Sequence, residues 1–524
     1  MANIFRSPSN RLSVSSAAFL LAGFSLAGAV LGLVRTSLIN SNYFNKFSTD
    51  AYFAAFKIPD LIFFALASGA LAVAFMPVLT ERITKTGRAS AWKLTSSILN
   101  TLALVSFVMS LVIMIFAPQI VDVLFHFPAE QKELCAAIMR IIAINPFLFS
   151  ISTVLTTAQQ AVGRFFFFAL APLIYNFSII LGILLFRDRL GIIAPAVGVA
   201  IGAILQLIVT AIGMLGLNFK YTWGINARNS DYTSVMKALP ARSVDQGIDH
   251  INGIFETRFA SGLGYGAVSN YENAMLLHNV PIMLIGIAIS TAAFPRFTER
   301  IAQGRPDLFR KEFLQIIRAM LWISLPVIVI TYFGNEYLAR LIAKTQNQEI
   351  ADILQFLVVA ILFRTLYAAV SRWFYAQKDT ATPLLVSLFA IALNITLAYT
   401  LSQPNVYGVV GLAIAQSITA FVEVVLLSIM MVKKDHKLFQ SDFIKAMLRI
   451  LSTAGFTIVT AAVMVALLPL DPLDRGLTLI AKLIIISSVT FMMHISISWV
   501  MRIEEVQPVI DRLKRFVLRP LRIQ

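Results

Sequence analysis

Long apolar segments, each of about twenty residues or more, divide the chain from end to end. A helix needs about twenty apolar residues to cross the hydrocarbon core of a bilayer, and a helix satisfies its own backbone hydrogen bonds there. Only 13% of the residues are charged and 58% are hydrophobic, whereas soluble domains carry about a quarter charged residues. The sequence therefore predicts an all-α polytopic membrane protein and excludes a soluble globular one.

The apolar segments predict about fourteen transmembrane helices. They lie near residues 13–39, 52–80, 92–118, 131–160, 167–187, 195–217, 241–261, 267–295, 312–334, 350–376, 382–401, 408–432, 446–469 and 478–501.

The Lys and Arg residues between these segments predict the orientation. They gather in alternate inter-helix segments, with the N-terminal segment on the rich side, so the positive-inside rule places both termini in the cytoplasm of a bacterial inner membrane. The net charge of +16 is spread along the chain in short clusters, which fits an anionic membrane surface and not nucleic acid. Residues 502–524 are basic and apolar in alternation, which favours an amphipathic helix on the inner leaflet; a solvated tail is the alternative.

An internal repeat relates the two halves of the chain. The pattern Ala-x-x-Pro-x-x-Thr-Glu-Arg at residues 74–82 recurs at 292–300, so Pro295 follows Pro77 by 218 residues, and Asn394 follows Asn176 by the same number. This offset carries the second predicted helix to the eighth, so both copies have the same orientation in the membrane. Parallel repeats of this kind are typical of transporters, and they predict a substrate site between the halves near the bilayer midplane.

The repeat predicts the domain organisation. We expect an N-terminal six-helix bundle at residues 1–217, a cytoplasmic linker at 218–240 and a parallel, pseudo-symmetric six-helix bundle at 241–435. Two extra helices at 436–501 and the basic amphipathic tail at 502–524 lie outside the repeat.

Short motifs occur at residues 32–35, 49–52, 55–59, 74–77, 258–261, 374–376, 379–383 and 411–413 and at Asn394. They resemble the motifs of the MurJ (MviN) lipid II flippase family. The resemblance covers roughly residues 12–435. It implies the multidrug/oligosaccharidyl-lipid/polysaccharide exporter fold, with a cationic cavity and a groove for a lipid tail. It also implies the substrate, an undecaprenyl-pyrophosphate-linked disaccharide-pentapeptide moved from the inner to the outer leaflet for cell-wall synthesis.

Three cations are the candidate substrate-binding residues. Charge within a membrane-spanning segment is costly and marks a functional site by default. Arg and Lys are the residue types that hold a pyrophosphate, and Arg35, Lys57 and Arg258 have the required charge. The resemblance also places Arg35 and Lys57 at cavity positions of the family. The alternative is snorkelling to the interface, or pairing with nearby carboxylates.

Three acidic residues are candidates for gating or ion coupling: Asp50, Asp60 and Glu272. Asp50 matches a family position, where an acid orients a neighbouring arginine or closes the external gate. An equally simple role for Asp50 is to cap the second predicted helix. His278 is expected to be a satisfied polar residue and not a proton relay.

The chain departs from the family at cavity positions where arginines are expected. Ala29, Phe63 and Leu276 stand there instead. Each lost charge-assisted bond removes about 1.5 to 3 kcal/mol of head-group binding. The head group is then held differently, for example through Lys57 and Arg258, or the cargo is not lipid II.

Other classes of function have weaker support. The five histidines lack metal spacing, the chain has one cysteine, and no glycine-rich ATP loop is present, so we expect no catalytic residues, metal or cofactor. The alternatives within transport are export of another polyprenyl-linked saccharide or of a drug by ion antiport. A non-transporting scaffold that recruits cell-wall synthases is the alternative outside transport. The outward position of Asp50 and Asp60 argues against a membrane-embedded transferase.

Overall fold

The computed structural model describes residues 14–43, 46–66, 69–343, 347–472, 474 and 476–511. Throughout these residues the secondary structure is helical, and the described part of the chain contains no strand. The prediction of an all-α membrane protein is therefore confirmed.

The chain divides into two compact units, Met1–Ser269 and Asn270–Gln524, called here the first and second unit. The helices of the first unit are α1 (Val14–Asn42), α2 (Lys46–Ala55), α3 (Lys57–Leu66), α4 (Gly69–Thr86), α5 (Arg88–Leu124), α6 (Ala129–Ile142), α7 (Asn145–Ala161), α8 (Phe166–Leu190), α9 (Ile193–Ile212) and α10 (Ser230–Ala260).

The boundary falls in the first turn of α11, so most of that helix belongs to the second unit. The remaining elements are α11 (Ala267–Pro281), η2 (Ile282–Ile287), α12 (Ala288–Ala302), α13 (Pro306–Phe333), α14 (Asn335–Ala343), α15 (Gln348–Ala376), α16 (Ala381–Leu401), α17 (Val409–Lys434), α18 (Ser441–Leu467), α19 (Leu477–Val500) and η3 (Glu504–Val506).

Twelve helical segments of the described chain are long and apolar enough to cross a membrane, and they match twelve of the fourteen predicted spans. The two predicted spans without such a segment are 52–80 and 241–261. The first is divided among α2, α3 and α4, none of which is both long and apolar. The second lies in α10, a continuous helix that carries seven charged residues. The count of fourteen therefore stays a prediction.

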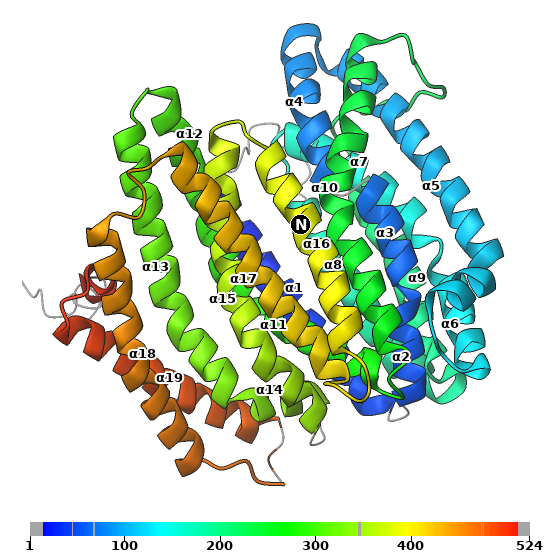
Figure 1. The fold of residues 1–524 in the computed structure, drawn as a ribbon. Helices are drawn as coiled ribbons and strands as arrows, with labels where there is room; N and C mark the ends of the chain where they lie inside the picture. Colours follow the sequence, from blue (N-terminus) through cyan, green and yellow to red (C-terminus); the bar gives the residue numbers. More distant parts are fainter. Residues whose placement is uncertain are drawn as a thin grey trace, which may run out of the picture. The chain divides into compact units, whose positions relative to one another are not determined.

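Helix α10 packs within the first unit. It contacts α3, α4 and α5, and Figure 1 shows it running beside α3 and α4. We predicted that a linker would end at residue 240 and that the second bundle would begin at 241. The structure instead has one helix through this boundary, and its contacts are with the N-terminal helices. The predicted domain limits remain a prediction based on the repeat.

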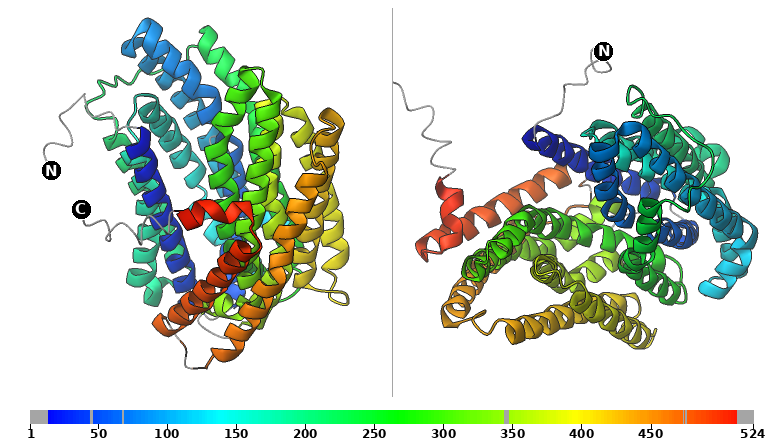
Figure 2. Two further views of the ribbon diagram at one scale, coloured as in Figure 1. Left: turned by 90° about the vertical axis from the view of Figure 1, so that its left-hand side faces the viewer. Right: turned by 90° about the horizontal axis from the view of Figure 1, so that it is seen from above.

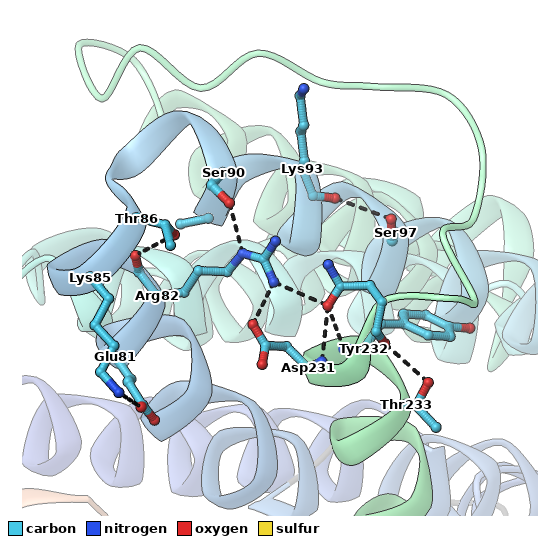
Figure 3. A network of polar contacts seen from close by, with 12 residues as sticks. Glu81, Arg82, Lys85, Thr86, Ser90, Lys93, Ser97, Asp231, Tyr232 and Thr233 are labelled. Atoms are coloured by element: carbon cyan, nitrogen blue, oxygen red, sulfur yellow. Dashed lines mark hydrogen bonds and ion pairs between the residues drawn. The ribbon is translucent and has the colours of Figure 1, made fainter.

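The repeated Thr-Glu-Arg motif fastens a helix end in each unit. In the first, Arg82 of α4 donates to Asn229 Oδ1 at 3.1 Å and forms an ion pair with Asp231 at the start of α10 (Figure 3). In the second, Arg300 of α12 forms an ion pair with Glu312 of α13 at 2.8 Å. The repeat keeps the cation and supplies a different acid in each unit.

Helices α18 and α19 are an addition to the second unit. They run beside each other (Figure 2), and α18 packs on α13. Trp322 of α13 anchors them, because its indole N–H donates to Ser498 Oγ at 2.8 Å and its carbonyl lies 3.0 Å from His494 Nε2. A buried cluster that includes Leu321, Leu325 and Ile450 covers this anchor.

Candidate functional site

Arg35 lies on the face of α1 that packs against α8. Its guanidinium donates from Nη1 to Asn176 Oδ1 at 3.0 Å. The amide nitrogen of Asn176 donates to the Pro172 carbonyl at 3.1 Å, so the amide oxygen is turned toward Arg35. The partner identified for this intramembrane cation is thus a neutral amide.

Within the described part of the chain, no ion pair compensates the positive charge of Arg35. No carboxylate bonds to Arg35 among the residues that the structure describes, and its Nε is buried without a hydrogen-bond partner there. The phenols of Tyr52 and Tyr175 lie within electrostatic range of both Arg35 and Asp60. Two predicted site residues, Arg35 and Asp60, thus act with opposite charge on the same pair of tyrosines.

Lys57 begins α3 and faces α10. A Cβ placed on Gly253 of α10 would lie 3.7 Å from Lys57 Nζ, and His250, one turn earlier, is within electrostatic range of the same ammonium. The ring of Phe64 stacks on His250, with the centroids 3.9 Å apart. Lys57 thus lies at a contact between α3 and α10 that combines a cation, an imidazole and an aromatic ring.

Packed rings occupy the region where the family pattern led us to expect arginines. Phe63 lies edge-on to Phe149 at 5.3 Å, and Phe149 lies edge-on to Tyr175 at the same distance. Since Tyr175 is one of the tyrosines near Arg35, this aromatic row extends from α3 to the Arg35 contact. The lost family cation is replaced here by apolar packing.

Asp50 binds the start of a helix distant in sequence. Its carboxylate accepts the backbone N–H groups of Gly266, at 2.6 Å, and Ser269, at 2.7 Å, at the N-terminus of α11, and the residue is fully buried. Gly266 has φ +93°, and a Cβ there would overlap Lys46. The backbone N–H groups at a helix start favour a negative partner. The sequence analysis gave a cap of the second predicted helix as the simpler role for Asp50. The structure has Asp50 inside α2, and its carboxylate caps the start of α11.

Arg258 contacts the end of α5. Its guanidinium donates to the carbonyl of Leu124 at 3.0 Å and to that of Val123. Nearby, Ser261 Oγ accepts the backbone N–H of His126 at 2.8 Å, so the end of α10 and the segment after α5 are fastened together. These bonds satisfy carbonyls that a helix C-terminus leaves without partners. Substrate binding by Arg258 stays a prediction, and its observed contacts are structural.

Glu272 lies in the part of α11 that belongs to the second unit, and it is partly buried. Two residues earlier, Asn270 bonds to Glu349 of α15 and accepts from Asn347 at 2.8 Å. Glu272 therefore follows a polar attachment between α11 and the start of α15. Its predicted role in gating or ion coupling is not tested by these contacts.

The second unit contains a buried polar network that the sequence analysis did not predict. Arg364 of α15 forms an ion pair with Glu423 of α17 at 2.8 Å, and Glu423 is 1% exposed. Ser387 of α16 donates to the same carboxylate at 2.7 Å and lies 3.0 Å from Tyr367. The signal that would have found this network is Glu423, an acid in the middle of a predicted span, since such acids need a partner.

Nearly the whole chain is similar to known proteins. Residues 39–487 match the family described as "Lipid II flippase MurJ". Two proteins named "Probable lipid II flippase MurJ" are among its relatives. The one from Borreliella burgdorferi is 22% identical over 450 residues, covering 85% of this chain and 88% of that protein. The one from Buchnera aphidicola (Acyrthosiphon pisum) is 26% identical over 463 residues, covering 84% and 88%.

Solved structures share the fold. "Lipid II flippase MurJ, inward closed conformation" superposes with a TM-score of 0.74 at 22% identity, covering 92% of this chain and 99% of that one. An inward-facing multidrug transporter of the MATE family, in the MOP superfamily, superposes with a TM-score of 0.65 at 16% identity, covering 78% and 96%. At these identities the likeness shows the fold.

Proposed function

Because the chain belongs to the MurJ family of lipid II flippases, we propose that it moves lipid II from the inner to the outer leaflet of a bacterial cell membrane by alternating access. The twelve long apolar helical segments of its described residues make it a multi-pass membrane protein, and its family is one of transporters. The predicted orientation, with both termini in the cytoplasm, is part of the proposal.

The contact of Arg35 with a neutral amide is the observation that supports a site for an anionic cargo. A pyrophosphate carries negative charge, and a guanidinium offers it several N–H donors in a fixed plane. Arg35 is held by a neutral amide, with the donor Nε still available. A carboxylate at this position would cancel the charge, whereas Asn176 orients the guanidinium and leaves its charge for the cargo.

Lys57 is the second proposed contact to the head group. Its ammonium lies beside Gly253, where the absence of a side chain leaves room on α10. Asp60 is proposed to compete with the cargo for these cations, because it lies within electrostatic range of the same tyrosines as Arg35. Asp50 is better suited to holding the start of α11 than to moving an ion, and Glu272 remains the candidate for ion coupling.

Depletion of the protein in its host tests the assignment. The measurement is the fraction of lipid II that an externally added lipid II-cleaving enzyme reaches in whole cells. Depletion should trap lipid II on the inner leaflet, and wild-type protein should restore access. Unchanged access after depletion would reject the lipid II assignment and leave open another polyprenyl-linked saccharide or a drug as cargo.

Variants R35Q and K57Q then test the site, with R189Q as the control because Arg189 is an exposed cation near the end of α8. Both site variants should fail to restore access at normal abundance in the membrane, and R189Q should restore it. A scaffold that only recruits cell-wall synthases would tolerate all three substitutions.

A further inference from the structure

A cationic pocket in the second unit lies where Arg318 of α13 meets the first turns of α18 and the segment after α19. It encloses about 290 Å³. Lys445 and Arg449 of α18 and Arg502, which follows α19, supply three of its lining side chains. None of the residues of the Arg35 contact takes part.

In the described structure, the charges of these three cations are not compensated by ion pairs. Among the residues that the structure describes, Lys445, Arg449 and Arg502 have no ion-pair or hydrogen-bond partner for their side chains. The carboxylates of Glu504 and Glu505, which also line the pocket, both bind Arg318. Asp442 is the remaining acid in the lining, so the pocket keeps a net positive charge.

The backbone holds the cations in register. Lys445 and Arg449 are four residues apart on α18 and thus share one face of the helix. Arg502 has φ +54°, a left-handed conformation that a non-glycine residue rarely adopts. It is fixed there because its own N–H donates to Trp499 O at 3.0 Å and the N–H of Ile503 donates to Ser498 O at 2.9 Å. The backbone hydrogen bonds that end α19 therefore fix the position of Arg502.

Exposed apolar side chains lie next to the pocket on the same two helices. Leu448 of α18 is 60% exposed, and Val500 of α19 is 69% exposed. Ile444, Leu451 and Trp499 are also exposed. In a membrane protein these side chains face lipid, and Trp is typical of the interface between head groups and acyl chains. The cations thus lie where an apolar surface ends.

We propose that this pocket, the α18–α19 anion site (Lys445, Arg449 and Arg502), binds the phosphate of an anionic phospholipid. Lys and Arg recognise a phosphate through charge-assisted hydrogen bonds. The adjacent apolar side chains favour a lipid over free phosphate, because they give the acyl chains a surface to pack on. With the predicted orientation, the lipid belongs to the anionic inner leaflet.

Titration of the purified full-length protein in a neutral detergent, followed by native mass spectrometry, tests this site. The probes are phosphatidylglycerol, phosphatidylcholine and inorganic phosphate. The site variant is K445Q/R449Q/R502Q. The control K311Q/K433Q/K437Q removes the same charge from exposed positions of α13, α17 and the segment after α17. We expect the site variant to bind phosphatidylglycerol at least about tenfold more weakly and the control to match the wild type.

The other outcomes decide against the proposal. An equal loss in both triple variants would mean attraction by general surface charge. Equal binding of phosphatidylcholine would mean that the phosphatidylglycerol charge is not recognised. Displacement of the lipid by millimolar inorganic phosphate would identify a free-phosphate site. The site variant replaces three charged side chains by neutral ones, so K445R/R449K/R502K serves as a second test. This variant keeps the charge and should keep the binding. Loss of its binding with an unchanged melting temperature would also overturn the site.

Discussion

Two arginines in membrane-spanning helices, one in each unit, are satisfied in different ways. Arg35 of the first unit donates to a neutral amide, whereas Arg364 of the second unit is paired with the buried carboxylate of Glu423. A neutral partner fixes the direction of a guanidinium and leaves its positive charge uncompensated. A buried carboxylate fixes the direction of the guanidinium and also compensates its positive charge. The comparison supports the proposal that Arg35 binds an anionic cargo and favours a structural role for Arg364.

The repeat-related asparagines accept from different donors. Asn176 of α8 accepts from Arg35, whereas Asn394 of α16, 218 residues later, accepts from the Thr419 hydroxyl at 3.4 Å. The two amides occupy equivalent places in the repeat. The repeat thus keeps the polar group, while the donor is a guanidinium in the first unit and a hydroxyl in the second.

The largest expected effect comes from breaking the pair in the second unit. R364L leaves the Glu423 carboxylate buried without its cation, which costs about 3 to 5 kcal/mol of unfolding free energy. E423L leaves the guanidinium in the same state and should cost a similar amount. Thermal unfolding of the purified protein in detergent measures both losses.

The double variant R364L/E423L is the matched control for this pair. Replacing both charges by apolar side chains removes the desolvation cost along with the attraction, so much of the stability should return. If the double variant is as unstable as the sum of the single ones, the pair is not the reason for the loss, and the contrast with Arg35 fails.

Asp50 gives the next largest effect and sharpens the comparison within the first unit. It is a charged residue like Arg35, but its carboxylate is engaged by the N–H groups of Gly266 and Ser269. D50A would leave two buried donors without this acceptor, at a cost of about 2 to 4 kcal/mol. Hydrogen exchange at the start of α11 should rise in D50A. Unchanged exchange there would show that the carboxylate does not hold this helix start.

Arg35 itself should give a functional loss with a small structural one. R35Q removes the charge but keeps a side chain that can bond to Asn176, so the unfolding free energy should change by less than about 1 kcal/mol. The loss of charge-assisted bonds to a pyrophosphate, about 1.5 to 3 kcal/mol, should slow lipid II transport about tenfold or more. Transport in vesicles and unfolding in detergent measure the two effects separately. A loss of stability equal to that of R364L would place Arg35 with the structural arginines.

The positions of the helices can be predicted from the sequence far better than the hydrogen-bond partners of the polar residues on them. Long apolar segments are a local property, and twelve of the predicted spans overlap a long apolar helical segment of the described chain. The partner of Arg35 is 141 positions away, and that of Asp50 is 216 or more. Such pairs depend on packing, which no local pattern encodes. The repeat pointed to Asn176, however, and the structure places its amide beside Arg35.

The smallest expected effect comes from a polar contact of the second unit outside the membrane-spanning helices. Asp379 precedes α16; burial opposes its ionisation, but bonds from Lys434 and Thr382 outweigh this and lower the pKa of Asp379 to about 2. A lowered folded-state pKa adds stability that is complete above the ordinary pKa of about 3.9 and is lost as the pH falls through about 2. D379N should therefore lower the free energy of unfolding by at most about 1 kcal/mol, constant from pH 8 to pH 5, and the difference from wild type should shrink below pH 4.

K434Q is the matched control for D379N. Adding K434Q to D379N should lower the free energy of unfolding little further, because both variants remove the same ion pair. A difference that already shrinks between pH 8 and pH 6 would assign the effect to another titrating group.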